Sequence, residues 1–228
     1  MKSDLFINKH KLHWLLVGVL FLALANVVNQ IVGKPYWGIT RFIYLGYDNN
    51  LSAWYSSMLF VAGAFLAHEC SVLARRNNVR GEGFLLFAML LIFMSADEVA
   101  QIHEIVGSYL AKFTGLSTME FAQHSAWVWI GGPVIIALFV AVAILLKREL
   151  AMVPGSLKLL LIGLGMIVVG GIVLEATINF LNHETLQWLW DVEIVLEETL
   201  EMVGSIFIAY SMQVWRDGIR SWPVPKLL

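Results

Sequence analysis

Six long runs of apolar residues constrain this chain more than any other feature. They cover approximately residues 12–33, 51–73, 83–110, 126–146, 157–181 and 186–214. A helix that crosses the hydrocarbon core of a bilayer needs about 20 such residues. Turn and charge signals such as Lys34-Pro35, Arg75-Arg76 and Pro154-Gly155 separate the runs. The sequence therefore predicts one all-α transmembrane domain, residues 1–228, with six membrane-spanning helices in a single bundle.

The composition supports a multi-pass membrane protein and excludes several other classes. Hydrophobic residues make up 59% of the chain and charged residues only 14%, whereas about 25% of an ordinary soluble domain is charged. These values exclude a disordered chain and a nucleic-acid binder with a basic face. Because Cys70 is the only cysteine, an intramolecular disulfide and a thiolate metal cage are excluded as well.

The Lys and Arg residues predict the orientation of the bundle. If the N-terminus is cytoplasmic, every Lys and Arg except Lys34, Arg41 and Lys112 falls on the cytoplasmic side. This strong positive-inside bias predicts that both termini lie in the cytoplasm and that the protein resides in a bacterial inner (plasma) membrane. A cleavable signal peptide ending near Ala25 is an alternative, but the apolar run continues through Val32, which favours an uncleaved first helix.

Carboxylates inside the predicted spans are the most informative polar residues. Each costs about 2.5–3.5 kcal/mol at the bilayer centre, and the three runs that hold them have no Lys or Arg apart from Lys158 at the very start of the fifth. They must therefore face the bundle interior or a wet cavity, and something must neutralise them. They are Asp97, Glu98 and Glu104 in the third run, Glu175 in the fifth, and Asp191, Glu193, Glu197, Glu198 and Glu201 in the sixth.

The predicted topology places these acids at one depth. The third and fifth runs lead outward and the sixth returns, so all three carry their carboxylates in the outer half. Gln101, His103, Asn179 and His183 fall at the same level. We therefore expect one acidic chamber that opens to the outer side. Trp127 and similar residues near the outer ends are expected in interfacial belts.

Helical spacing sorts these residues by face, at about 100° per residue. Asp97, Gln101 and Glu104 share a stripe of the third run, and His103 points away from it.

The sixth run carries two neighbouring acidic stripes. Glu193, Glu197 and Glu201 lie at i, i+4 and i+8, and Asp191 and Glu198 lie beside them. In the fifth run, Glu175, Asn179 and His183 align if the helix continues.

Three species could balance the negative charge: a divalent metal ion, protons, or an organic cation or basic partner. Carboxylates with a histidine suit Fe, Mn, Zn or Ca, which the residue types do not distinguish. The metal patterns His-Glu-x-x-His and Glu-x-x-His are absent from the sequence. A structural, partly protonated acid network is the alternative. The expected metal ligands are Glu98, His103, Glu104, Glu197, Glu198 and Glu201, with Asp97 or Glu175 as the catalytic base.

Three segments resemble a bacterial family of uncharacterised multi-span membrane proteins. They are Ser95–Glu104 with its DE…HE pattern, Glu197–Gly204 with its EE…EM…G pattern, and Asn50–Ser57 at the start of the second run. This resemblance implies the multi-span fold and no particular activity. A weaker resemblance is to the membrane hydrolase superfamily of alkaline ceramidases, in which Ser57 and Asp97 would match the family's Ser and Asp. The terminal His pair of that superfamily is replaced here by Glu197 and Glu201.

The sequence favours a metal-dependent membrane enzyme, a hydrolase or an oxidoreductase, that acts on a lipid or another amphipathic substrate at the outer side. A cation or proton-coupled transporter is the first alternative, but it requires a polar route through the cytoplasmic half, where His68 and Glu69 are the only candidates. The second alternative is a membrane assembly subunit whose acids bind a basic protein partner. No nucleic-acid partner is expected.

Overall fold

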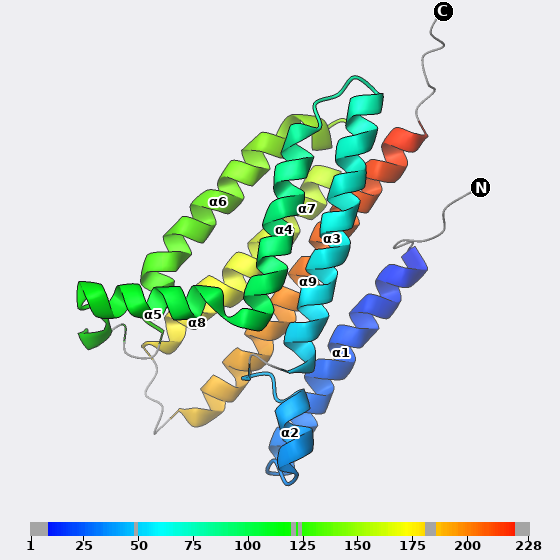
Figure 1. Cartoon of the computed structure of the whole chain (residues 1–228). Helices are drawn as coiled ribbons and strands as arrows, with labels where there is room; N and C mark the ends of the chain where they lie inside the picture. The colour runs from blue at the N-terminus through cyan, green and yellow to red at the C-terminus, as the bar shows by residue number, and fades with distance from the viewer. Residues whose placement is uncertain (1–8, 48–49, 120–121, 123–124, 181–185, 222–228) are drawn as a thin grey trace, which may run out of the picture.

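The fold is a bundle of long helices crossed by one helix at its side (Figure 1). The computed structural model describes residues 9–47, 50–119, 122, 125–180 and 186–221. All regular structure within these ranges is helical. The elements are α1 (Lys9–Ile31), α2 (Trp37–Ile43), α3 (Leu51–Arg76), α4 (Glu82–Ala100), α5 (Ile102–Thr114), η1 (Leu116–Thr118), α6 (Trp127–Leu150), α7 (Ser156–Val168), η3 (Val169–Leu174), α8 (Glu175–Ile178) and α9 (Gln187–Arg220).

Five segments are long and apolar enough to cross a membrane. They are Lys11–Ile31, Leu51–Arg76, Glu82–Ala100, Trp127–Leu150 and Ser156–Ile178. This finding agrees with the predicted membrane class. Helix α9 is long enough, since its 34 residues span roughly 50 Å at 1.5 Å per residue. Its carboxylates make it too polar to count among the five.

Helix α9 forms the centre of the bundle and packs against α1, α3 and α7. Helices α3 and α4 form an antiparallel pair beside it. Trp215 of α9 belongs to the main hydrophobic core, and its ring lies 4.4 Å from that of Phe84 on α4. Both side chains are fully buried. The half of α9 that follows Met202 is the more deeply buried; in the polar half before it Glu193 is buried, whereas Trp188, Val192 and Leu196 are exposed.

The predicted third span is wrong in its outer part, because it is two helices. Gln101 adopts the left-handed conformation with φ of 53° and ends α4 at Ala100. The chain then turns into α5, which runs across the bundle (Figure 1). The sequence has no Pro or Gly at this position, so the break could not be predicted from local turn signals.

The predicted fifth span also departs from a regular α-helix. Helix α7 changes into a π-helical turn, η3, before α8. Here two glycines permit a close approach to α9: a Cβ on Gly170 would lie 2.9 Å from the Glu197 carbonyl oxygen, and one on Gly171 would overlap the Glu201 carboxylate. The π-turn thus brings the start of α8, and Glu175 with it, close to the acidic part of α9.

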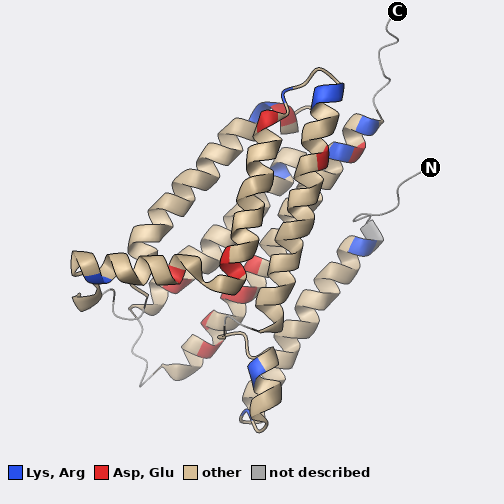
Figure 2. Ribbon diagram, viewed as in Figure 1, with Lys and Arg blue, Asp and Glu red and all other residues tan. Residues whose placement is uncertain are grey.

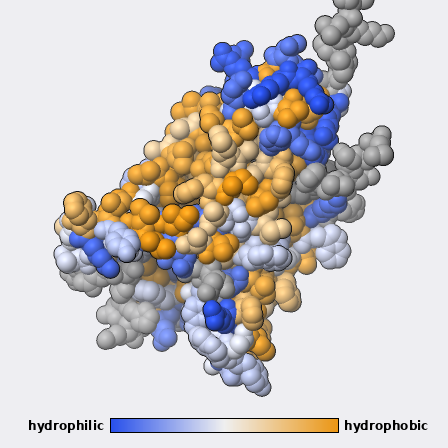
Figure 3. Space-filling view, viewed as in Figure 1, coloured by the Kyte–Doolittle hydropathy of each residue, from blue (hydrophilic) through white to orange (hydrophobic). Residues whose placement is uncertain are grey.

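The charges divide the bundle into two ends (Figure 2). The end where α3 and α6 finish and α4 begins carries a cluster of basic side chains, which we call the basic end; it includes Arg75, Arg76, Arg80, Lys147 and Arg148. Acidic residues gather in the opposite half, between α4, α5 and α9. The surface over α4 and α6 is largely hydrophobic (Figure 3).

Candidate functional site

One cavity of about 600 Å³ lies between α4, α5, α6, η3 and α9. We call it the acidic cavity, because eight carboxylates line it and no Lys or Arg of the described chain does. These carboxylates are Asp97, Glu98, Glu104, Glu175, Glu193, Glu197, Glu198 and Glu201. The structure therefore brings together, from four segments, almost all the acids that the sequence placed at one depth.

A histidine and an aspartate form a pair at the break between α4 and α5. His103 Nδ1 lies 2.7 Å from Asp97 Oδ2, and the His103 backbone N–H donates to Asp97 Oδ1 at 2.8 Å. The prediction that His103 points away from Asp97 is wrong, since it assumed one straight helix. Because the chain turns at Gln101, His103 at the start of α5 contacts Asp97 near the end of α4.

Electrostatics favour a protonated His103. Burial lowers the pKa of His103, but the hydrogen bond and negative charge of Asp97, with the charges of Glu104 and Glu175, raise it more, so the pKa lies above its ordinary value. A histidine ring held in this way can accept and donate a proton, which suits an acid–base group.

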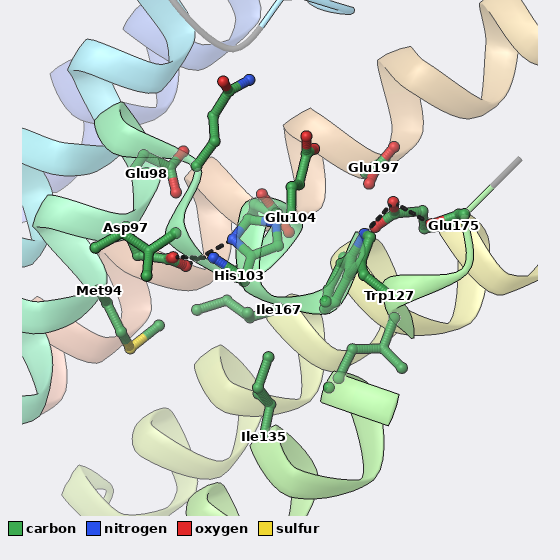
Figure 4. A pocket seen from close by; sticks show the side chains of 18 of the residues that line it. Met94, Asp97, Glu98, His103, Glu104, Trp127, Ile135, Ile167, Glu175 and Glu197 are labelled. Carbon is green, nitrogen blue, oxygen red and sulfur yellow. Dashed lines mark hydrogen bonds and ion pairs between the residues drawn. The ribbon is translucent and has the colours of Figure 1, made fainter. Parts of the chain in front are cut away.

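Glu175 is held by two donors and a neighbouring ring. Ser125 Oγ donates to its carboxylate at 2.5 Å and Trp127 Nε1 at 2.6 Å. Asn179 in turn accepts the Ser125 backbone N–H at 2.9 Å. The Trp127 ring lies against His103, with centroids 4.4 Å apart. Glu175 and His103 are thus fixed on either side of one indole ring (Figure 4).

Close packing of α5 on α6 sets this arrangement. A Cβ on Gly107 would overlap Trp127, so α5 can approach the start of α6 only because this residue is glycine. The prediction that Trp127 belongs to an interfacial belt is wrong, because its side chain is buried in the cavity wall. Trp190 of α9 lines the cavity as well. Spacing alone does not distinguish such a tryptophan from a belt residue.

Helix α9 supplies the other half of the acid cluster. Glu193, Glu197 and Glu201 line the cavity together, as their i, i+4, i+8 spacing predicts. Glu198 also faces it and accepts a hydrogen bond from Ser52 Oγ of α3 at 3.1 Å. Glu98 of α4 interacts electrostatically with Glu198 and Glu201, so the two helices place like charges opposite each other.

The opposite side of the cavity is apolar. Met94, Ile135 and Ile167 lie across from the polar side chains (Figure 4). Farther along the wall, Phe93 of α4 is 54% exposed and Leu138 of α6 is 42% exposed. The cavity therefore extends from the acid cluster to the hydrophobic outer surface between α4 and α6.

Two predicted chamber residues of the described chain, Asp191 and Asn179, do not line the cavity, although Gln101 does. Asn179 acts behind the cavity wall through Ser125. His183 lies outside the described residues, so its predicted position stays a prediction. Ser57 hydrogen-bonds to Ser95, at 2.8 Å between the two hydroxyl oxygens, and does not line the cavity with Asp97.

The expected metal ligands share the cavity without forming a compact coordination group. All six of them line it. Within the described part of the chain, however, no three His, Cys, Asp or Glu side chains are grouped closely enough to hold an ion. The donor types fit a hard or borderline cation, but the side chains would have to move together to coordinate it.

Comparison with known proteins shows the family. The model of a domain of unknown function, DUF8692, matches residues 14–215. The chain therefore belongs to this family, which agrees with the expected membership in an uncharacterised family. No curated protein and no solved structure matches the chain, so the resemblance to ceramidase-like hydrolases gains no support.

Proposed function

We propose that this chain is a membrane enzyme that takes an amphipathic molecule into the acidic cavity and acts on it by acid–base chemistry. One observation carries the proposal: the same cavity joins a partly buried histidine–aspartate pair to an apolar wall that reaches the hydrophobic surface. Such a cavity can hold a polar head beside the catalytic groups while the apolar part of the molecule stays in contact with lipid.

In this proposal His103 is the acid–base residue. Asp97 accepts a hydrogen bond from Nδ1–H of the ring, and this leaves Nε2 to exchange a proton with the substrate. Asp97 thus serves as the residue that orients the base, which refines the expectation that it is the base itself. Glu175, held by Ser125 and Trp127, is the second candidate for proton transfer.

The metal-dependent form of the proposal rests on donor chemistry. A divalent ion of Fe, Mn, Zn or Ca would be held by the carboxylates of Glu98, Glu104, Glu197, Glu198 and Glu201. If His103 also bound the ion through Nδ1, it would have to give up its hydrogen bond to Asp97. A bound ion would supply Lewis acidity to a substrate oxygen. Elemental analysis of purified protein tests this form, and Glu198→Gln should reduce the metal content.

The contacts near the basic end favour an enzyme over a transporter, which would need a polar route through that half of the bundle. Glu69, the predicted polar residue of that half, is paired with Arg216 at 2.9 Å. It does not line the acidic cavity. With the positive-inside orientation, the cavity would face the outer leaflet of a bacterial inner membrane.

Lipid turnover in reconstituted protein tests the proposed function. The full chain is placed in bilayers made from a bacterial lipid extract, and products are identified by mass spectrometry. We expect His103→Gln to slow conversion by about 10²–10⁴-fold, the usual contribution of a general acid–base group. His13→Gln is the matched control, since His13 lies on α1 outside the cavity. Equal conversion by the His103 variant and the wild type would contradict the proposed role.

A further inference from the structure

We propose that the amphipathic ligand of the acidic cavity carries a positively charged nitrogen in its head group, as a long-chain amine does. This inference rests on the proposed function and specifies its substrate class. Its basis is the charge of the cavity, an unsatisfied buried carboxylate oxygen in its wall, and the apolar path to the lipid-facing surface.

The charge of the cavity selects against anionic head groups. Eight carboxylates and one histidine line it, and no basic residue of the described chain does. A phosphate or carboxylate head would meet like charges on α4, η3–α8 and α9 without a guanidinium or ammonium partner. A cationic head instead offsets the repulsion between Glu98, Glu198 and Glu201.

A second observation points to a hydrogen-bond donor on the ligand. Glu193 is only 7% exposed, and its carboxyl shares a side-chain hydrogen bond with Glu197, but its Oε1 has no hydrogen-bond partner among the described residues. Leaving a buried carboxyl oxygen unsatisfied is costly. The side chain lines the cavity, so an ammonium N–H of the ligand can supply the missing donor.

The neighbours of Glu193 suit the same head group. Trp190 and Glu197 lie three residues before and four residues after it on α9, so all three share a face, and all three line the cavity. An aromatic face beside carboxylates is a common arrangement for binding alkylammonium groups.

The apolar side of the cavity supplies the place for a chain. Met94 and Ile135 continue the wall toward Phe93 and Leu138, which are exposed on the hydrophobic surface. A hydrocarbon tail can therefore leave the acid cluster between α4 and α6 and remain in contact with lipid. A bare metal ion would use the carboxylates but not this path.

Competition binding with ligands of equal tail length tests the inference. The purified full chain, in a neutral detergent at pH 7, binds radiolabelled hexadecylamine, and unlabelled competitors displace it. The competitors are hexadecyltrimethylammonium, hexadecanol, hexadecanoate, ethylamine and, separately, Ca²⁺, Mn²⁺ and Zn²⁺. We expect the amine to bind at least tenfold more tightly than the alcohol, and the carboxylate to bind most weakly. Ethylamine should compete at least tenfold less well than hexadecylamine, because it lacks the tail.

Two pairs of variants locate the binding. Glu193→Gln should weaken amine binding about tenfold and leave hexadecanol binding unchanged, whereas Glu82→Gln, at an exposed acid outside the cavity, should change neither. Leu138→Trp narrows the apolar path and should weaken all long-chain ligands. Ile144→Trp, at a 70% exposed site on the same helix that does not line the cavity, is its control.

The outcomes separate this inference from the proposed function. If alcohol and amine bind equally, and Leu138→Trp weakens both, the charge selectivity is wrong while the amphipathic site stands. If no sixteen-carbon compound binds, the proposed function fails as well. If ethylamine or a divalent ion displaces hexadecylamine as well as the unlabelled amine does, the cavity recognises charge alone and the inference is overturned. The competitor series needs only wild-type protein, so it remains decisive if Glu193→Gln does not fold.

Discussion

Two glycines of α7, two residues apart, should respond oppositely to the same substitution. Gly163 faces α9: an added Cβ would lie 2.7 Å from the Gly204 carbonyl oxygen and 2.8 Å from Ile208 Cγ1. Gly165 has no atom within 4 Å of such a Cβ. Each Gly→Ala change removes the same backbone flexibility, so only the packing of Gly163 differs.

The magnitude follows from these contacts. An alanine in an open helical position stabilises by about 0.5–1 kcal/mol relative to glycine. At Gly163 the new methyl group meets backbone, which cannot rotate away, so α7 must move from α9. Overpacking of this kind costs about 1–3 kcal/mol. Gly163→Ala should therefore destabilise by about 1–2 kcal/mol, and Gly165→Ala should stabilise slightly.

Thermal unfolding of the detergent-solubilised chain measures both changes. For a chain of this size, 1 kcal/mol corresponds to about 2–4 °C in Tm. Gly163→Ala should also weaken ligand binding, because α7 leads directly into η3 and Glu175. Equal Tm values for the two variants would refute the reasoning that backbone contact between α7 and α9 holds the cavity together.

The remaining predictions concern the cavity and the turn beside it. The pKa of His103 is raised in the folded chain, so its pairing with Asp97 should stabilise the fold fully below the unfolded pKa of about 6.5 and less as pH rises through the folded pKa. The Tm difference between wild type and Asp97→Asn should therefore shrink as pH rises over that range. A difference that grows would contradict this reasoning. Glu175→Gln should cost about 1–3 kcal/mol, because it disturbs two hydrogen bonds to a largely enclosed carboxyl group. The Tm of this variant and of Trp127→Phe, which removes one of the two donors, measures the loss. Gln101→Val should destabilise by about 1–2 kcal/mol, since a β-branched residue resists φ of 53°, whereas Gln101→Gly should not; a similar loss in both would indicate a side-chain role instead.

Local pattern was sufficient for most of the helices. Apolar runs and turn signals locate the ends of α1, α3 and α6 within four residues and the end of α9 within six, because the length of a span and its breaks are local properties. Helix α2 was not anticipated, and the break at Gln101 could not be, since a left-handed residue without Gly or Pro leaves no local signal. That break decides whether His103 meets Asp97.

The sequence alone indicates that the site is acidic, but it does not show how the side chains are arranged. Charges without partners in apolar runs must share an interior, so the sequence places the carboxylates of α4, α8 and α9 together. The same reasoning missed Ser125 and assigned Trp127 to a belt. Both hydrogen-bond to Glu175 where the start of α6 meets α8, a contact between segments about 50 residues apart in the chain.

By itself, the sequence determined an all-helical membrane-type chain with a concentrated negative charge in one half, because hydrophobicity and charge act residue by residue. Only the tertiary structure decided which acids surround one cavity, which residue orients His103, and that an apolar path leaves between α4 and α6. These depend on how helices diverge and approach, and that is set by contacts between residues distant in the chain, such as Gly163 and Gly204.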